Sequence, residues 1–203
     1  MEEQREPTEL PMLGSERRER SDAAKNRVAI LAAAERLVAE RGVGAVSMDE
    51  VACAACVGKG TLFRRFGNRA SLLRALLDER ERTFQEGFIR GPAPLGPGAP
   101  APQRLVAFGH RLLEMSETHG ELLAAAESGS SGQRLRHSVY GVYRLHVKAL
   151  LREIAPERDP DYMADALLAT LAAELVLHQR RNQGLTLQQL KDGWQELVSL
   201  IAG

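Results

Sequence analysis

The sequence contains no long apolar run. Residues 1–20 are charged and hold no apolar core stretch, so nothing there resembles a secretory signal peptide. No later apolar segment is long enough to span a bilayer. We therefore expect a soluble, cytoplasmic protein with no membrane partner. The tail at residues 1–20 changes from acidic to basic and carries Pro7 and Pro11, which predicts disorder.

Arrangements of residues for catalysis or cofactor binding are also missing. No Ser/His/Asp grouping stands in a recognisable context, and no phosphate-binding glycine loop occurs. Among the five histidines His178 has a partner at helical ligand spacing, Glu174, which lies four residues earlier. We interpret these two as a hydrogen-bonded pair in a core or an interface. The sequence therefore predicts no catalytic residue, no metal and no cofactor, and we do not expect an enzyme.

Cysteine is scarce: the chain contains two, Cys53 and Cys56, in a single CxxC. One CxxC supplies too few ligands for a four-coordinate zinc site. Two interpretations stay open. The pair is either a thiol switch that loosens this segment on oxidation, or simply two small residues at positions that need small side chains. The second interpretation agrees with a cytosolic protein, because the cytosol keeps thiols reduced.

Alternating strand patterns are absent, and helical periodicity runs through almost the whole chain. Ser47 and Glu50 form a capping-box pattern, as do Thr186 and Gln189, so each pair predicts a helix start. The first half predicts helices at residues 22–41, 48–55, 59–65 and 69–88. The second half predicts a helix that Gly120 breaks, and further helices at 133–154, at 160–181 and from 187 onward. The fold class is therefore all-α, with about nine helices.

The formal net charge is zero, which argues against general polyanion binding. The charge is nevertheless uneven. Residues 57–74 contain Lys59, Arg64, Arg65, Arg69 and Arg74 and neither Asp nor Glu. Such a local basic patch is what contact with phosphates requires.

The basic patch coincides with two short helices joined by a tight turn, which is the pattern of a helix-turn-helix. Small residues stand where the two helices would cross. The outer face of the second helix carries Lys59, Thr61 and Arg64. Lysine or arginine can pair with guanine in a major groove, and threonine can meet a thymine methyl group or a phosphate. The alternative is a helical hairpin inside an ordinary core.

Here the sequence resembles a known family. The stretch RVAILAAA (27–34), SMDEVA (47–52) and VGKGTLFRRFGNR (57–69) is similar to the signature of the tetracycline-repressor (TetR/AcrR) family over about residues 21–77. The resemblance implies a cytoplasmic homodimer that binds a palindromic operator in double-stranded DNA and is released by a small-molecule effector. Repression is the usual outcome that it implies, and activation is possible.

The resemblance also assigns roles to single residues. Ser47 would cap its helix and touch a phosphate. The other residues that it places on DNA are Lys59, Gly60, Thr61, Phe63, Arg64 and Arg69. Arg20 is open: it is either part of a basic arm along the DNA backbone or part of a solvated tail. Three positions depart from the pattern. Phe63 replaces a tyrosine, Gly58 replaces a Ser or Thr cap, and Cys56 replaces a turn glycine, which costs ~1 kcal/mol or more if the position needs positive φ.

With the resemblance, the chain divides into five segments. These are a disordered tail (1–20), a helix-turn-helix DNA-binding domain (21–68), a connecting fourth helix (69–90), a Pro/Gly-rich linker (91–102) and a ligand-binding and dimerisation domain (103–203). The linker cannot be helical because proline removes amide donors and glycine raises chain entropy.

Two sets of residues are candidates in the last segment. Polar tips among apolar helical positions fit an apolar pocket with a few orienting groups, and fit satisfied core residues equally well. The predicted ligand-binding residues are Phe108, Met115, Tyr140, Tyr143, His146, Glu174 and His178. The last two helices can pair with their copies as a four-helix bundle, although internal packing explains their apolar stripes as well. The predicted dimerisation residues are Leu167, Leu171, Leu187, Leu190, Trp194 and Leu197.

Two rival functions stay open. A redox-sensing regulator would act through Cys53 and Cys56. A helical interaction protein that does not bind DNA would have no use for Lys59, Thr61 and Arg64 beside a basic helix start.

Overall fold

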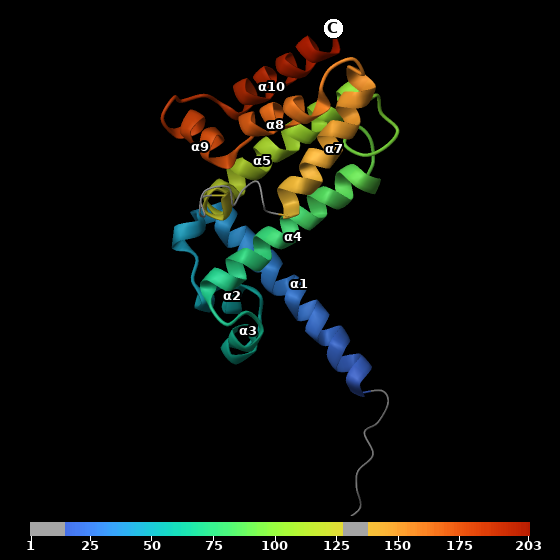
Figure 1. Ribbon diagram of the computed structural model, residues 1–203. Helices are drawn as coiled ribbons and strands as arrows, with labels where there is room; N and C mark the ends of the chain where they lie inside the picture. Colours follow the sequence, from blue (N-terminus) through green and yellow to red (C-terminus); the bar gives the residue numbers. More distant parts are fainter. Residues whose placement is uncertain (1–14, 128–137) are drawn as a thin grey trace, which may run out of the picture.

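The computed structural model describes the backbone of residues 15–127 and 138–203, and every regular element in these ranges is helical. The helices form a smaller N-terminal part and a larger C-terminal part, joined at a narrow waist (Figure 1). The predicted all-α class is confirmed. The tail at 1–14 and the loop expected at 128–132 lie outside the described residues.

The smaller part consists of α1 (Ser15–Arg41), the short 3-10 helix η1 (Val43–Ala45), α2 (Met48–Ala54) and α3 (Lys59–Phe66). Its core is a cluster of buried side chains centred on Ile30, Val51 and Leu62, each with no exposed surface. We expected α1 to begin at residue 22 and residues 1–20 to be disordered, and for residues 15–20 this is wrong. No Gly or Pro stands between Ser15 and Arg41, and the charged Glu and Arg of this segment are good helix formers.

The helix α4 (Arg69–Arg90) belongs to both parts of the molecule. The side chain of Asn68 caps it by accepting from the Ser71 amide at 2.9 Å, as its position in the sequence suggested. The first half of α4 contributes Leu72 and Leu76 to the smaller core. The second half contributes Phe84 and Phe88 to the larger core. A displacement of either half therefore moves the other, because the helix between them is continuous.

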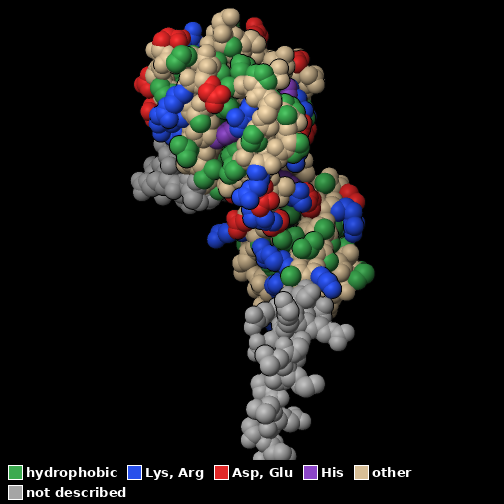
Figure 2. Space-filling view, turned by 90° about the vertical axis from the view of Figure 1, so that its right-hand side faces the viewer, with side chains coloured by type: hydrophobic (Ala, Val, Ile, Leu, Met, Phe, Trp, Pro, Cys, Tyr) green, Lys and Arg blue, Asp and Glu red, His purple; other side chains and the backbone are tan. Residues whose placement is uncertain are grey.

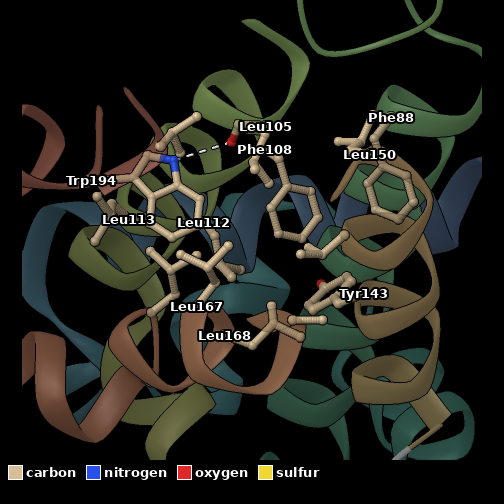
Figure 3. Close-up of a cluster of buried hydrophobic side chains, with 14 of the residues drawn as sticks. Phe88, Leu105, Phe108, Leu112, Leu113, Tyr143, Leu150, Leu167, Leu168 and Trp194 are labelled. Carbon is tan, nitrogen blue, oxygen red and sulfur yellow. Dashed lines mark hydrogen bonds between the residues drawn. The ribbon is translucent and has the colours of Figure 1, made fainter. Parts of the chain in front are cut away.

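The larger part contains α5 (Ala101–Glu127), α7 (Ser138–Ile154), α8 (Pro160–Thr170), α9 (Ala173–Arg181) and α10 (Leu187–Ala202). Helix α5 is central and packs against α4, α7, α9 and α10. The indole Nε1 of Trp194 donates to the carbonyl of Leu105 at 3.1 Å and so ties α10 to α5 (Figure 3). Gly109 permits this approach, since a β-carbon there would overlap the indole ring.

The single helix predicted for residues 160–181 is wrong, because the chain breaks between α8 and α9 at Leu171 and Ala172. Neither Gly nor Pro marks the break. In one straight helix Leu171 and Val176 would point about 140° apart at ~100° per residue. The break lets both be buried, with α8 against α7 and α9 against α5. The break predicted at Gly120 is confirmed by the non-helical backbone of His119 within α5.

Candidate nucleic-acid interface

The first turns of α2 and α3 set the geometry of the candidate interface. The Ser47 hydroxyl accepts from the Glu50 amide at 3.3 Å, and Glu50 Oε2 accepts from the Ser47 amide at 3.0 Å, so the predicted capping box is confirmed. Hydrogen bonds from Ser47, with a smaller effect of Arg41, lower the pKa of Glu50. The Ser47 hydroxyl is thus already engaged in the cap, at the exposed start of α2.

Helix α3 presents a face to solvent. Leu62 and Phe66 point into the core, whereas Lys59, Gly60 and Arg64 are exposed. Thr61 is half-buried beside Arg64, whose Nη2 lies 3.4 Å from the threonine hydroxyl oxygen. The predicted groove-facing residues therefore share one outer face of α3.

Lys59 has a partner within the protein. Its Nζ lies 2.7 Å from Oδ2 of Asp49 on α2, and both side chains are well exposed. Exposed ion pairs contribute ~0–1 kcal/mol, so a phosphate oxygen can replace the carboxylate at little cost. Asp49 thus holds Lys59 in place without burying its charge.

The turn between α2 and α3 is a Schellman motif. The Cys56 amide donates to the Cys53 carbonyl at 3.1 Å, and the Val57 amide donates to the Ala52 carbonyl at 3.0 Å. Cys56 adopts φ 53°, and among the described residues it is the only non-glycine with positive φ. Cys56 therefore carries the backbone strain that we expect of a cysteine at a position that favours glycine. Cys53 and Cys56 are both exposed and are not joined to each other by a disulfide.

Arg69 forms hydrogen bonds within the protein, and its contact with a DNA phosphate stays a prediction. Its Nε donates to the carbonyl of Val46 at 2.6 Å, and its Nη2 donates to the carbonyl of Val43. The half-buried guanidinium thus ties the start of α4 to the segment before α2. Sequence reasoning missed this role because the acceptors are backbone atoms far away in the chain.

Phe63 and Arg20 are the other two residues to which the resemblance assigns a DNA contact. Phe63 is 46% exposed on the outer face of α3, and its contact with DNA stays a prediction. Arg20 belongs to α1, and its side chain lies outside the described residues.

Charged groups also gather where the two parts of the protein meet, and sequence reasoning missed them. Arg80 of α4 forms an ion pair with Glu35 of α1. The buried His119 of α5 brings its Nε2 to 3.7 Å from Oε1 of Glu35. Burial, with the charges of Arg80 and Arg111, lowers the pKa of His119. Basic and acidic side chains lie side by side at this waist (Figure 2).

Most of the predicted ligand-binding residues cluster in the larger core. Phe108, Met115 and Tyr143 are buried, and the ring of Tyr143 lies 5.6 Å from that of Phe108 (Figure 3). His146 stacks on Phe88 with ring centroids 4.3 Å apart. Tyr140 lies at the rim of this core, where its hydroxyl donates to Asp165 at 2.8 Å.

Glu174 and His178 are exposed on the outer side of α9, so they form no buried core pair. The prediction placed them on the same helix face as Leu167 and Leu171. It is wrong because the break before α9 changes the direction of the chain.

The predicted dimerisation residues fall into two groups. Leu167, Leu171 and Trp194 are buried inside the protomer, so their assignment to an interface is wrong. Leu187 and Leu190 are half-buried, and Leu197 is 40% exposed. A groove of about 380 Å³ runs along α8, α9 and α10, and Leu175 and Leu197 form part of its lining. The surface around this groove stays accessible to a second copy.

No described helix has an apolar stretch suited to crossing a membrane. Within residues 15–127 and 138–203, no three His, Cys, Asp or Glu side chains gather as metal ligands would.

Comparison of the sequence with known proteins gives matches in the smaller part. Residues 30–76 match the family described as bacterial regulatory proteins, tetR family. The chain is 37% identical over 67 residues to the HTH-type transcriptional regulator TtgR of Pseudomonas putida, a match that covers 33% of this chain and 32% of TtgR. It is 36% identical over 73 residues to the HTH-type transcriptional repressor BepR of Brucella suis, covering 36% and 34%. The matched region spans about a third of these relatives' length.

Comparison with solved structures covers most of the chain. A transcriptional regulator from Rhodococcus sp. Rha1 aligns with a TM-score of 0.64 at 21% identity, covering 86% of this chain and 95% of that one. The regulator FadR from Bacillus subtilis in complex with stearoyl-CoA aligns with a TM-score of 0.61 at 19% identity, covering 84% and 96%. At these identities the likeness shows the fold, which both parts of the molecule share with these regulators.

Proposed function

The N-terminal domain of this chain belongs to the tetR family of bacterial regulatory proteins, and from that premise we propose that the protein is a ligand-responsive transcription regulator. It binds a palindromic operator as a homodimer and leaves it when a small molecule binds the larger domain. It acts in the cytoplasm and has no enzymatic activity. Repression is the favoured outcome, because one relative with a matching DNA-binding domain is described as a repressor.

The observation that carries the proposal is the outer face of α3. Lys59, Thr61 and Arg64 lie together on a helix whose opposite side is buried against α2 and α4. A helix presented in this way fits a major groove, and its cations and hydroxyl supply both phosphate and base contacts. An ordinary core hairpin would have no reason to expose this set.

Helix α4 supports a mechanism for release. Because it contributes to both cores, a ligand that repacks Phe84 and Phe88 also displaces Leu72 and Leu76 beneath the DNA-binding helices. In a dimer, that displacement changes the spacing between the two α3 helices, and spacing decides whether both fit successive major grooves. The loss of DNA affinity is limited by the ligand's preference for one of the two states.

The dimer is proposed from the same geometry. A palindrome is read by two helix-turn-helix units related by a two-fold axis. Helices α9 and α10 offer exposed leucines, Leu175, Leu197 and Leu200, beside the groove on the larger domain. This accessible apolar surface, rather than the buried Leu167, Leu171 and Trp194, is the place where a second copy would pack.

The test is DNA binding as a function of salt. The purified protein is titrated into a fluorescent duplex from the intergenic region beside its own gene, at two salt concentrations, and into duplexes selected from a random pool. Binding that weakens steeply with salt is expected, because phosphate contacts release counterions. The double variant Lys59→Ala and Arg64→Ala should lose it, whereas Arg152→Ala, on the exposed side of α7, should not. Absence of binding to any duplex would refute the regulator and favour a helical interaction protein.

A second candidate is a redox-sensing regulator, which the exposure of both Cys53, in the last turn of α2, and Cys56, in the turn before α3, favours. A peroxide would take two electrons from the two thiols, giving a disulfide and water and altering the turn. DNA binding of the wild type and of the Cys53→Ser, Cys56→Ser variant is compared with and without hydrogen peroxide. If the two proteins respond equally to peroxide, the cysteines play no part in sensing.

A further inference from the structure

Arg104, on the first turn of α5, differs from the other half-buried arginines of the described residues. Its Nε is buried without a hydrogen-bond partner, as is the Nε of Arg80, but Arg80 has the carboxylate of Glu35, whereas no described carboxylate forms an ion pair with Arg104. The others are all engaged by carboxylates, backbone carbonyls or a ring: Arg80 with Glu35, Arg144 with Asp161 and Asp165, Arg180 with Glu117, Arg69 with Val43 and Val46, and Arg27 with Phe66. A buried donor without a partner is costly, and this half-buried guanidinium has no counter-charge, so the position invites an anion.

His146 of α7 is the second polar group at this place. Its Nε2 is also buried without a partner among the described residues. The ring stacks on Phe88 and lies 5.4 Å from the ring of Phe108. Arg104 stands four residues before Phe108, so both project from the same face of α5. Burial, together with the nearby charge of Arg104, lowers the pKa of His146 to about 4, so the imidazole is neutral at neutral pH and can donate one hydrogen bond.

The rings that His146 contacts belong to an apolar cluster. Phe84, Phe88, Phe108 and Tyr143 form a ring cluster with centroids 5.1–6.1 Å apart. A cation and a neutral donor at the edge of such a cluster match a molecule with one anionic end and an apolar body. A carboxylate fits this pair, because its two oxygens accept from guanidinium and imidazole together.

We propose that Arg104 and His146 bind the carboxylate of a small monocarboxylic acid whose apolar body packs against the aromatic cluster of Phe88, Phe108 and Tyr143. The proposal rests on the proposed function and names the chemical class of the effector. The rings are closely packed in this structure, so the acid must displace them to enter. Phe84 and Phe88 belong to α4, and their displacement is transmitted along that helix toward the DNA-binding helices.

The experiment compares charged and neutral probes of the same shape. Benzoate and octanoate are titrated calorimetrically into the full-length protein, beside benzamide and octanamide. The variants are Arg104→Gln and His146→Gln, and Arg152→Gln on the exposed side of α7 controls for loss of a positive charge. We expect at least one carboxylate to bind at least tenfold more tightly than its amide, Arg104→Gln to lose most of that preference, and Arg152→Gln to keep it. Binding of benzoate or of octanoate shows whether the apolar part of the effector is aromatic or aliphatic.

A second readout separates binding from a merely structural role. The pKa of His146, followed by NMR of its ring protons, should rise on binding the carboxylate, because the anion favours the charged imidazole. Equal binding of acid and amide, an unchanged preference in Arg104→Gln, or no binding of either carboxylate at millimolar concentration overturns the proposal. DNA binding is measured against salt on the same preparation. If it remains salt-sensitive, the proposed function as a transcription regulator holds even when the ligand proposal fails.

Discussion

Arg80 of α4 pairs with Glu35 of α1 at the junction between the two parts of the protein, with both side chains about three-quarters removed from water. Helix α5 reaches the same carboxylate through His119. The three helices that meet there are the first helix of the DNA-binding domain, the helix shared by both cores and the central helix of the larger domain. The pair therefore couples the two parts by charge in addition to the packing of α4.

Glu35→Gln should lower the free energy of unfolding by about 1–3 kcal/mol, because it leaves a half-buried guanidinium without its counter-charge. Urea denaturation followed by circular dichroism measures the change. The matched control is Glu86→Gln, which breaks the exposed pair with Arg82 and should cost less than ~1 kcal/mol. Equal losses in the two variants would show that the junction pair contributes no more than a surface pair.

Cys56→Gly should raise the free energy of unfolding by ~1 kcal/mol. The residue adopts φ 53° in the Schellman turn, where glycine avoids the contact between β-carbon and carbonyl. Thermal unfolding under reducing conditions provides the measurement. Cys53→Ala, at an exposed helical position, should change stability little. A loss of stability in Cys56→Gly would mean that the thiol makes a contact worth more than the strain.

Gly109→Ala should destabilise the larger domain by about 1–3 kcal/mol, since the new methyl group would overlap the indole ring of Trp194. Fluorescence of Trp194, the sole tryptophan, reports the displacement directly. Gly141→Ala is the matched control, because it faces open space on α7 and should gain about 0.5–1 kcal/mol from helix propensity. If Gly109→Ala is as stable as the control, α5 and α10 do not pack as closely as described.

Lowering the pH should destabilise the protein through His146. Its pKa is about 4 in the folded protein, mainly because of burial, against 6.5 ordinarily. Between these values the unfolded chain binds a proton that the native imidazole does not, so stability falls as the pH drops through this window. The loss should reach about 1–2 kcal/mol after allowance for partial exposure of the ring. Urea denaturation of wild type and His146→Gln at pH 7 and pH 4.5 measures it, and parallel pH dependence in both proteins would contradict it.

The sequence predicted helix starts, an exposed helix face and a turn correctly where each depends on residues close together in the chain. The capping boxes at Ser47 and Thr186 are formed as expected, because each side chain bonds an amide only three residues away. The exposed face with Lys59 and Arg64 follows from helical periodicity. The left-handed backbone of Cys56 follows from the turn that joins two adjacent helices.

The sequence was a poor guide to residues whose packing or bonding partners are distant in the chain. Leu167 and Trp194 looked like interface residues because a stripe of apolar side chains does not say which surface covers it. The internal hydrogen bonds of Arg69 were not predicted, because the acceptors are backbone carbonyls of another segment. Glu174 and His178 were misplaced because no local signal marks the break between α8 and α9, which tertiary burial imposes.

The sequence by itself therefore determined the all-α class, the helix-turn-helix and its basic face, because periodicity, caps and a short turn are properties of neighbouring residues. Only the tertiary structure decided that α4 is shared by two cores, that Glu35, Arg80 and His119 meet, and that His146 stacks on Phe88 beside Phe108. Burial and charge pairing act through space, so they are settled only when distant segments pack.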